Sequence, residues 1–145
     1  MSAVKYNVHI IVYKGDPLDY QKFRHTGIWF TPVLDGAHYF FHIIETDQGY
    51  LFETRPNFDP TKSRTFAEKV DVGETRISLA PSELMRTMQR VPIENDNPEF
   101  NCHLWVDRAT TAMVDRGYLT RQQCDDGLDE MMEITLKATD EPTLE

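Results

Sequence analysis

The first half of the chain has the pattern of short β-strands. Runs rich in Val, Ile, Phe, Tyr and Thr alternate with turn residues, among them the Asp35-Gly36 dipeptide, which strongly favours a hairpin. Pro56 and Pro60 predict a loop over residues 55–65. The predicted strands cover residues 4–13, 26–31, 38–45, 50–53 and 66–72. We therefore expect an antiparallel sheet of four or five strands.

The second half has the pattern of three helices. They are predicted over residues 82–91, over residues 102–116 and after residue 120. Each begins at a helix-start signal: Pro81 at a first helical position, Asn101 as an N-cap, and Thr120 with Gln123 as a capping box. Strands followed by helices predict an α+β fold in which the three helices pack on one face of the sheet.

Apolar residues at helical spacing predict which face of each helix is buried. On the second helix they are Cys102, Trp105, Val106, Ala109, Ala112 and Met113. On the third they are Cys124, Leu128, Met131 and Met132, followed by Thr135.

Length and charge limit the classes of function. A chain of 145 residues fits one domain, predicted over residues 1–138 and followed by a flexible acidic tail over residues 139–145. The net charge is −9, and residues 125–145 alone carry −7 of it. This charge disfavours general binding to nucleic acid or to anionic membranes. Two cysteines, with no apparent signal peptide or long apolar run, predict a cytoplasmic protein with reduced thiols and no cofactor.

Cys102 is the most informative position. Directly after the Asn101 cap, it falls at the first residue of its helix, where free backbone N–H groups and the helix dipole favour a thiolate. Its place on the apolar stripe turns the sulfur toward the protein interior. The alternative is a small buried hydrophobic residue, which is the usual role of a free cysteine.

A nucleophilic cysteine needs a base, and two histidines are candidates. His25 precedes one predicted strand and His42 lies in the next, on the other side of the Asp35-Gly36 turn. A hairpin centred on that turn brings these two residues within about one pair of being opposite. We expect the two rings to be neighbours, although a single strand histidine is more often structural.

The remaining histidines and Cys124 have less specific patterns. His38 and His42 lie too far apart along a strand, at roughly 13 Å, to hold one metal ion. His103 points about 100° around the helix from Cys102 and is predicted to be partly exposed. His9 is predicted to be structural, and Cys124 to pack in the core. Any pocket residues are expected in the loop over residues 55–65.

Three segments resemble permuted papain-like thiol enzymes. They are residues 24–30 (RHTGIWF), 41–44 (FHII) and 101–106 (NCHLWV). In order and context they resemble the lecithin:retinol acyltransferase-like branch of the NlpC-type cysteine peptidase superfamily. The chain is also similar to small, poorly characterised fungal proteins with Arg-His-Thr and Asn-Cys-x-x-Trp-Val motifs. The resemblance implies a permuted papain-like fold, with Cys102 as nucleophile, His25 as general base and His42 as the group that orients the base.

The function expected from these residues is acyl chemistry on a small molecule or peptide. A Cys102 thiolate would attack an amide, ester or thioester, and the acyl group would pass to water or to another acceptor. Two alternatives remain open at the level of sequence. One is a binding or assembly protein that keeps the fold without turnover. The other is a biosynthetic isomerase or cyclase that uses His25 without a covalent step.

Overall fold

The computed structural model describes residues 3–15 and 24–138 of the chain. Five strands come first: β1 (Tyr6–Tyr13), β2 (Thr26–Pro32), β3 (Tyr39–Thr46), β4 (Gly49–Pro56) and β5 (Phe66–Glu74). A short 3-10 helix, η2 (Pro60–Lys62), lies between β4 and β5. Three helices follow: α1 (Pro81–Gln89), α2 (Cys102–Asp115) and α3 (Arg121–Leu136).

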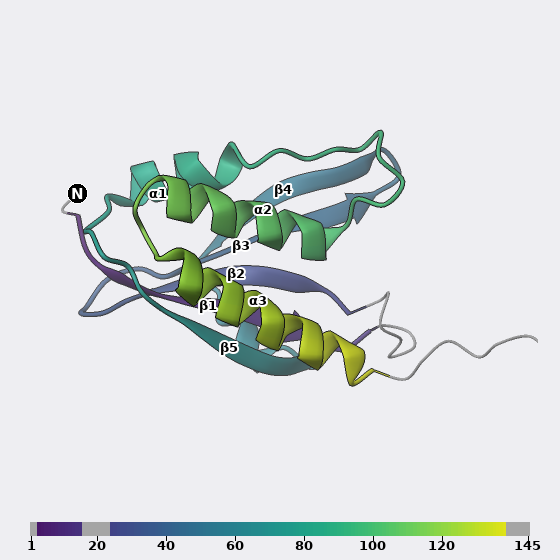
Figure 1. The fold of residues 1–145 in the computed structure, drawn as a ribbon, viewed down its shortest axis with the longest axis horizontal. Helices are drawn as coiled ribbons and strands as arrows, with labels where there is room; N and C mark the ends of the chain where they lie inside the picture. Colours follow the sequence, from purple (N-terminus) through teal and green to yellow (C-terminus); the bar gives the residue numbers. More distant parts are fainter. Residues whose placement is uncertain (1–2, 16–23, 139–145) are drawn as a thin grey trace, which may run out of the picture.

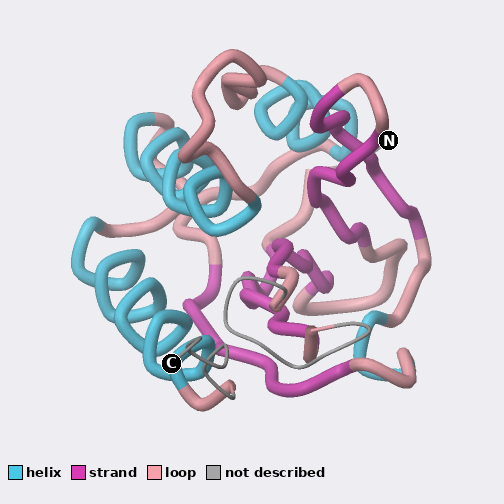
Figure 2. The backbone as a smooth tube through the Cα atoms, turned by 90° about the vertical axis from the view of Figure 1, so that its right-hand side faces the viewer, coloured by secondary structure: helices cyan, strands magenta, loops and turns pink. Residues whose placement is uncertain are grey.

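The strands form one antiparallel sheet in the order β4-β3-β2-β1-β5. The first four strands make a meander, and β5 returns to pair with β1 at the other edge. All three helices lie on the same side of the sheet (Figures 1 and 2). The predicted α+β class, with helices on one face, is confirmed.

The two faces of the sheet have different environments because side chains alternate along a strand. The face under the helices, here called the covered face, supplies the main core with residues such as Ile10, Ile28 and Phe41. The other face, here called the open face, carries a smaller buried group of Ile11, Tyr13 and Phe40. His25 and His42 belong to the open-face set of positions, while Cys102 starts a helix on the covered side.

The predicted loop over residues 55–65 begins later than expected. Strand β4 continues through Arg55 and pairs as far as Pro56, opposite Tyr39. Pro56 is tolerated because it ends a strand at the sheet edge, where no ladder hydrogen bond is required of it. The segment between the strands then includes η2, which is capped by the Asp59 side chain.

The buried face of α3 differs in part from the predicted stripe. Cys124, Met131 and Thr135 are buried as expected, but Met132 is 42% exposed. Gly127 takes part of the contact instead, and a Cβ there would lie 3.1 Å from a methyl group of Val72. A glycine gives no hydrophobic signal, so the close approach of α3 to β5 could not be seen in the pattern of apolar residues.

The sequence also carries predictions about membrane-spanning helices and about the C-terminal tail. Within residues 3–15 and 24–138, no helix has the length and apolar character needed to cross a membrane. The predicted tail over residues 139–145 lies outside the described residues.

Candidate functional site

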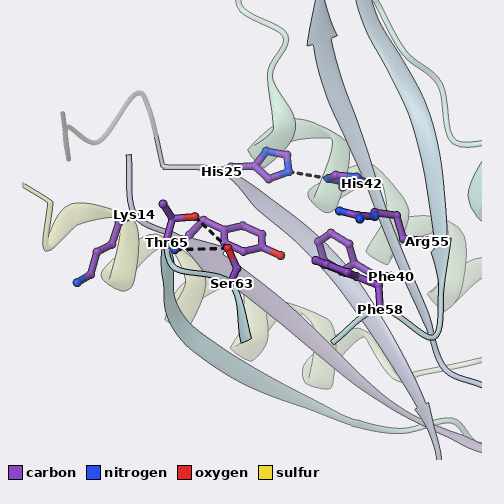
Figure 3. A pocket seen from close by; sticks show the side chains of 9 residues that line it. Lys14, His25, Phe40, His42, Arg55, Phe58, Ser63 and Thr65 are labelled. Atoms are coloured by element: carbon purple, nitrogen blue, oxygen red, sulfur yellow. Dashed lines mark hydrogen bonds between the residues drawn. The ribbon is translucent and has the colours of Figure 1, made fainter. Parts of the chain in front are cut away.

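The β2–β3 hairpin brings His25 and His42 together. Its register pairs Ile28 with Phe41 and Phe30 with Tyr39, one position away from the register expected for a turn centred on Asp35-Gly36. The His25 Nε2 and the His42 Nδ1 atoms lie 2.9 Å apart (Figure 3). The two rings are therefore hydrogen-bonded neighbours, as the sequence predicted.

Glu53 on β4 extends this pair to a chain of three groups. It lies opposite His42 in the β3–β4 register, and its Oε1 atom is 2.7 Å from the His42 Nε2 atom. A carboxylate only accepts hydrogen bonds, so His42 donates from Nε2. Burial lowers the pKa of His42 and so favours the neutral ring. The hydrogen bond with Glu53 acts in the opposite direction but does not outweigh burial.

The order of donors fixes the free nitrogen of His25. A neutral His42 that donates from Nε2 has only an acceptor at Nδ1. His25 must then donate its Nε2–H to that acceptor. The lone pair of a neutral His25 is consequently left on Nδ1, where it can accept a proton from another group.

Cys102 begins α2 as predicted. The Asn101 side chain accepts a hydrogen bond of 3.0 Å from the Leu104 backbone N–H and caps the helix. The Cys102 side chain is half-buried, and its Sγ atom lies 3.9 Å from the carbonyl oxygen of Arg24. Since Arg24 directly precedes His25, the first residue of α2 packs beside the start of β2.

Two imidazoles favour the thiolate form of Cys102. Burial alone would raise the pKa of the Cys102 thiol, but hydrogen bonding by His103 and by His25, with the charge of these rings, holds that pKa well below its ordinary value. For His103, burial alone would lower the pKa of the ring. The hydrogen bond with Cys102 outweighs burial and raises this pKa above its ordinary value. The arrangement therefore favours a thiolate paired with an imidazolium.

His103 is partly exposed, as the sequence predicted. Helical geometry also placed its side chain away from Cys102, and in this respect the prediction was wrong. In the structure its Nε2 atom donates a 2.8 Å hydrogen bond to the Arg24 carbonyl, which Cys102 also approaches. Helical spacing fixes only the direction in which a side chain leaves the backbone. Here the imidazole turns toward the backbone carbonyl of Arg24, just before β2 begins.

The second cysteine has the opposite environment. Cys124 is fully buried on α3, with its Sγ atom 3.8 Å from the Thr110 carbonyl oxygen. Burial raises the pKa of this thiol to about 11. The predicted core role of Cys124 is confirmed, and it serves as an internal reference for Cys102.

Gly27 makes room for the histidine pair. A Cβ at this position would lie 2.5 Å from a ring carbon of Phe40 and 3.0 Å from the Cβ of His42. Neither distance is compatible with an unshifted neighbour. The glycine between His25 and Ile28 therefore allows β3 side chains to lie across β2 beside His25.

A pocket of about 380 Å³ adjoins the two histidines on the open face (Figure 3). Beside His25, His42 and Phe40, it is lined by Tyr13 and Lys14 at the end of β1. The other lining residues that the structure describes come from the stretch where the sequence predicted pocket residues: Arg55, Phe58, Ser63 and Thr65.

The remaining histidines have partners of their own on the open face. His9 is hydrogen-bonded to Asp71 at 2.8 Å and to Thr31 at 3.0 Å, in keeping with its predicted structural role. His38 accepts a hydrogen bond of 3.1 Å from the Trp29 indole. Among the residues that the structure describes, no group of three or more His, Cys, Asp or Glu side chains is arranged to hold a metal ion.

The comparisons with known proteins give one match. A family described as "Family of unknown function (DUF6540)" matches residues 8–120, which include every residue of the site described above. No curated protein and no solved structure matches the chain.

Proposed function

The chain belongs to the DUF6540 family, and from its candidate site we propose that it is a cysteine-dependent hydrolase or acyl transferase. The proposal assigns Cys102 as the nucleophile and His25 as the general base. His42 orients His25, and Glu53 holds His42 in the required tautomer. The permuted papain-like relationship suggested by the sequence motifs is part of the same proposal.

The proposed reaction has two steps. In the first, Nδ1 of His25 takes the Cys102 proton, and the sulfur attacks the carbonyl carbon of an amide, ester or thioester. The tetrahedral intermediate collapses to an acyl-thioester as the leaving group departs with the proton held by His25. In the second, water or another acceptor gives a proton to His25, attacks the thioester and releases the Cys102 sulfur.

The helix start supports the charged states of this reaction. The backbone N–H of Cys102 lies at the first residue of α2, where no intrahelical carbonyl is available to it. Such an N–H can donate to the oxyanion of the tetrahedral intermediate. The pKa of His103 is raised by its hydrogen bond with Cys102, which favours a positive charge beside the sulfur, so the proposal assigns His103 to stabilising the thiolate.

One observation carries the proposal. Cys102, a thiol whose pKa is held low, lies beside His25. The Nε2 atom of His25 is hydrogen-bonded to a second histidine, which is hydrogen-bonded in turn to a carboxylate. A nucleophile, a base and an oriented support for the base are what this class of catalysis needs. The order of hydrogen-bond donors leaves the lone pair of His25 on the nitrogen that does not face His42.

Alkylation with iodoacetamide tests the proposed nucleophile. Modification of intact protein at pH 6 to 7, followed by peptide mapping, should label Cys102 much faster than Cys124. His25→Ala should slow the labelling of Cys102 without exposing Cys124. Equal and slow labelling of the two cysteines would contradict the proposal and favour a protein that only binds its partner.

Glu53 provides a second test, because its assigned role acts through His42. Glu53→Gln keeps the size of the side chain, but its amide can donate to His42 and permit the wrong tautomer. With an ester substrate, the acylation rate should fall about 10²-fold or more, in the range of losses for a misdirected base, while Glu53→Asp should recover part of it. Equal rates for Glu53→Gln and the wild type would remove Glu53 from the assignment.

A further inference from the structure

The pocket beside the histidine pair has the size of a small-molecule site. Its volume of about 380 Å³ lies in the range of known ligand pockets, roughly 300–1,000 Å³. His25 and His42 form one part of its wall, and Arg55 with Phe58 forms another (Figure 3). A molecule held here would touch the proposed general base.

The described lining of the pocket has a charge opposite to that of the chain. Two cationic side chains, Lys14 and Arg55, line it, and within residues 3–15 and 24–138 no Asp or Glu is among its lining residues. The whole chain has a net charge of −9. Two nearby carboxylates have other partners: Glu53 binds His42, and Asp59 accepts two hydrogen bonds from Thr61.

Arg55 is arranged to present its N–H groups to a ligand. Its guanidinium carbon lies 3.9 Å from the centre of the Phe58 ring, which fixes the planar group by stacking. The side chain is 48% exposed, and its nearest carboxylate contact, from Nε to Glu53, is as long as 4.0 Å. A stacked guanidinium keeps its in-plane donors free for a carboxylate or phosphate, which it can bind through two parallel hydrogen bonds.

Among the described residues, the rest of the lining is apolar or polar without a fixed charge. Phe58 offers a partly exposed ring, and the buried ring of Phe40 lies 5.7 Å from it, centre to centre. Burial raises the pKa of Tyr13 to about 12, so the phenol remains protonated and neutral. Ser63 and Thr65 add hydroxyl groups, which can donate to an anion. A ligand that fits has an anionic end and an apolar body.

We propose that this pocket binds a small organic anion, in which a carboxylate or phosphate contacts Arg55 and an apolar portion packs on Phe58. This proposal deepens the proposed function. It rests on that function for one point, which is that the bound anion is part of the substrate. The anion would anchor one end of the molecule while its carbonyl group extends past His25 toward Cys102.

Binding to a protein that cannot react separates this proposal from catalysis. Cys102→Ala protein is titrated with 3-phenylpropanoate, phenyl phosphate and the uncharged 3-phenylpropanamide, and binding is followed by chemical-shift changes and calorimetry. We expect at least one of the two anions to bind about tenfold or more tightly than the amide, since charge-assisted hydrogen bonds contribute this much. Comparison of the two anions identifies the preferred charged group.

Two matched substitutions locate the anion. Arg55→Met in the Cys102→Ala protein should weaken anion binding about tenfold or more, and it should leave binding of the amide unchanged. Arg76→Met makes the same change of charge at an exposed position outside the pocket and should have no effect. Lys14→Met repeats the test from the other side of the pocket if Arg55→Met does not fold.

The outcomes are separable. Equal binding of the anions and the amide, no binding of either anion, or equal effects of Arg55→Met and Arg76→Met would overturn the pocket proposal. Anion binding that depends on Arg55, in a protein whose Cys102 shows no selective alkylation, would uphold the pocket and reject the thiol enzyme. Selective alkylation without anion binding would give the opposite result.

Discussion

Two imidazoles act on the Cys102 sulfur, and they come from distant parts of the sequence. His103 is its neighbour on α2, while His25 precedes β2. Both lower the pKa of Cys102, with hydrogen bonding by His103 the larger of the two contributions. At the scale of residues, the charge of this sulfur therefore depends on a pair of histidines with different proposed tasks: one stabilises the thiolate, and the other exchanges protons with it.

Substitution of His103 separates these tasks. His103→Ala should raise the pKa of Cys102, because the thiolate loses an imidazolium partner. The alkylation rate of Cys102, measured against pH, should then rise at a higher pH than in the wild type. His38→Ala, which removes a histidine bound to Trp29, is the matched control and should leave the curve in place. An unchanged curve for His103→Ala would show that this histidine does not set the charge of Cys102.

The sequence could predict some of these residues and not others. Cys102 was identifiable as a candidate nucleophile from the Asn101 cap. The proximity of His25 and His42 followed from the hairpin turn predicted between their two strands. Glu53 lies opposite His42 across β3 and β4, and this register follows from the Thr46–Gly49 turn, so the pairing had a signal in the sequence. The direction of the His103 ring depends on the Arg24 carbonyl, a tertiary contact with no signal in local sequence.

Among the elements, the N-terminus of α2 positions the sulfur. The Asn101 side chain accepts from the Leu104 N–H, which leaves the Cys102 N–H available. Asn101→Ala should lower the free energy of unfolding by about 1 kcal/mol through loss of the cap. Asn101→Asp should keep the cap, and therefore most of the stability, but its carboxylate should raise the pKa of Cys102.

Urea denaturation and the pH dependence of alkylation measure the two effects separately. The expected result is that Asn101→Ala mainly changes the denaturation midpoint and Asn101→Asp mainly changes the alkylation curve. If Asn101→Asp left the curve unchanged, the thiolate would not be sensitive to charge at the helix start, and the role given to α2 would be wrong.

The β2–β3 hairpin imposes a second requirement at the scale of elements. Because a Cβ at Gly27 would collide with Phe40 and crowd His42, Gly27→Ala must move at least one of these side chains. We expect a loss of about 1–3 kcal/mol in the free energy of unfolding, which is typical of overpacking, together with slower alkylation of Cys102. Leu51→Ala, at a 55% exposed position of β4, is a control for a substitution in the same sheet. A Gly27→Ala protein as stable and as reactive as the wild type would contradict the crowded geometry.

For the whole molecule, the architecture was more predictable than its details. The strand pattern and the three helix-start signals were sufficient to predict an antiparallel sheet of four or five strands with helices on one face, because these signals are local. The late end of β4 and the contact of Gly127 with β5 were not predictable, since both depend on pairing and packing between separate elements.

The pH dependence of stability is a property of the whole fold. Burial lowers the pKa values of His9 and His42, so the unfolded chain binds more protons than the folded one as the pH falls below about 6.5. The opposite shifts of Cys102 and His103 offset each other only between about pH 6.5 and 8.5; below that range His103 is protonated in the unfolded chain as well, and the low pKa of Cys102 adds to the same loss of stability on acidification. The free energy of unfolding should therefore be fully developed above about pH 7 and should decrease between about pH 6.5 and 5.

Urea titrations across this range check the sign. The decrease should be smaller in His42→Gln protein, which lacks one of the two buried histidines, than in the wild type. Stability that increases on acidification, or the same slope in both proteins, would contradict the assignment of buried neutral histidines.

The most direct test of the central claim is the transfer of an acyl group to Cys102. Brief reaction of the wild-type protein with p-nitrophenyl acetate, quenched in acid and followed by peptide mapping, should place one acetyl group on Cys102, with a matching burst of nitrophenol. His25→Ala should reduce the burst rate about 10²-fold or more, and Cys102→Ser should abolish the thioester. Acetylation confined to lysine side chains, or a burst that is unchanged in Cys102→Ser protein, would show that Cys102 is not the nucleophile.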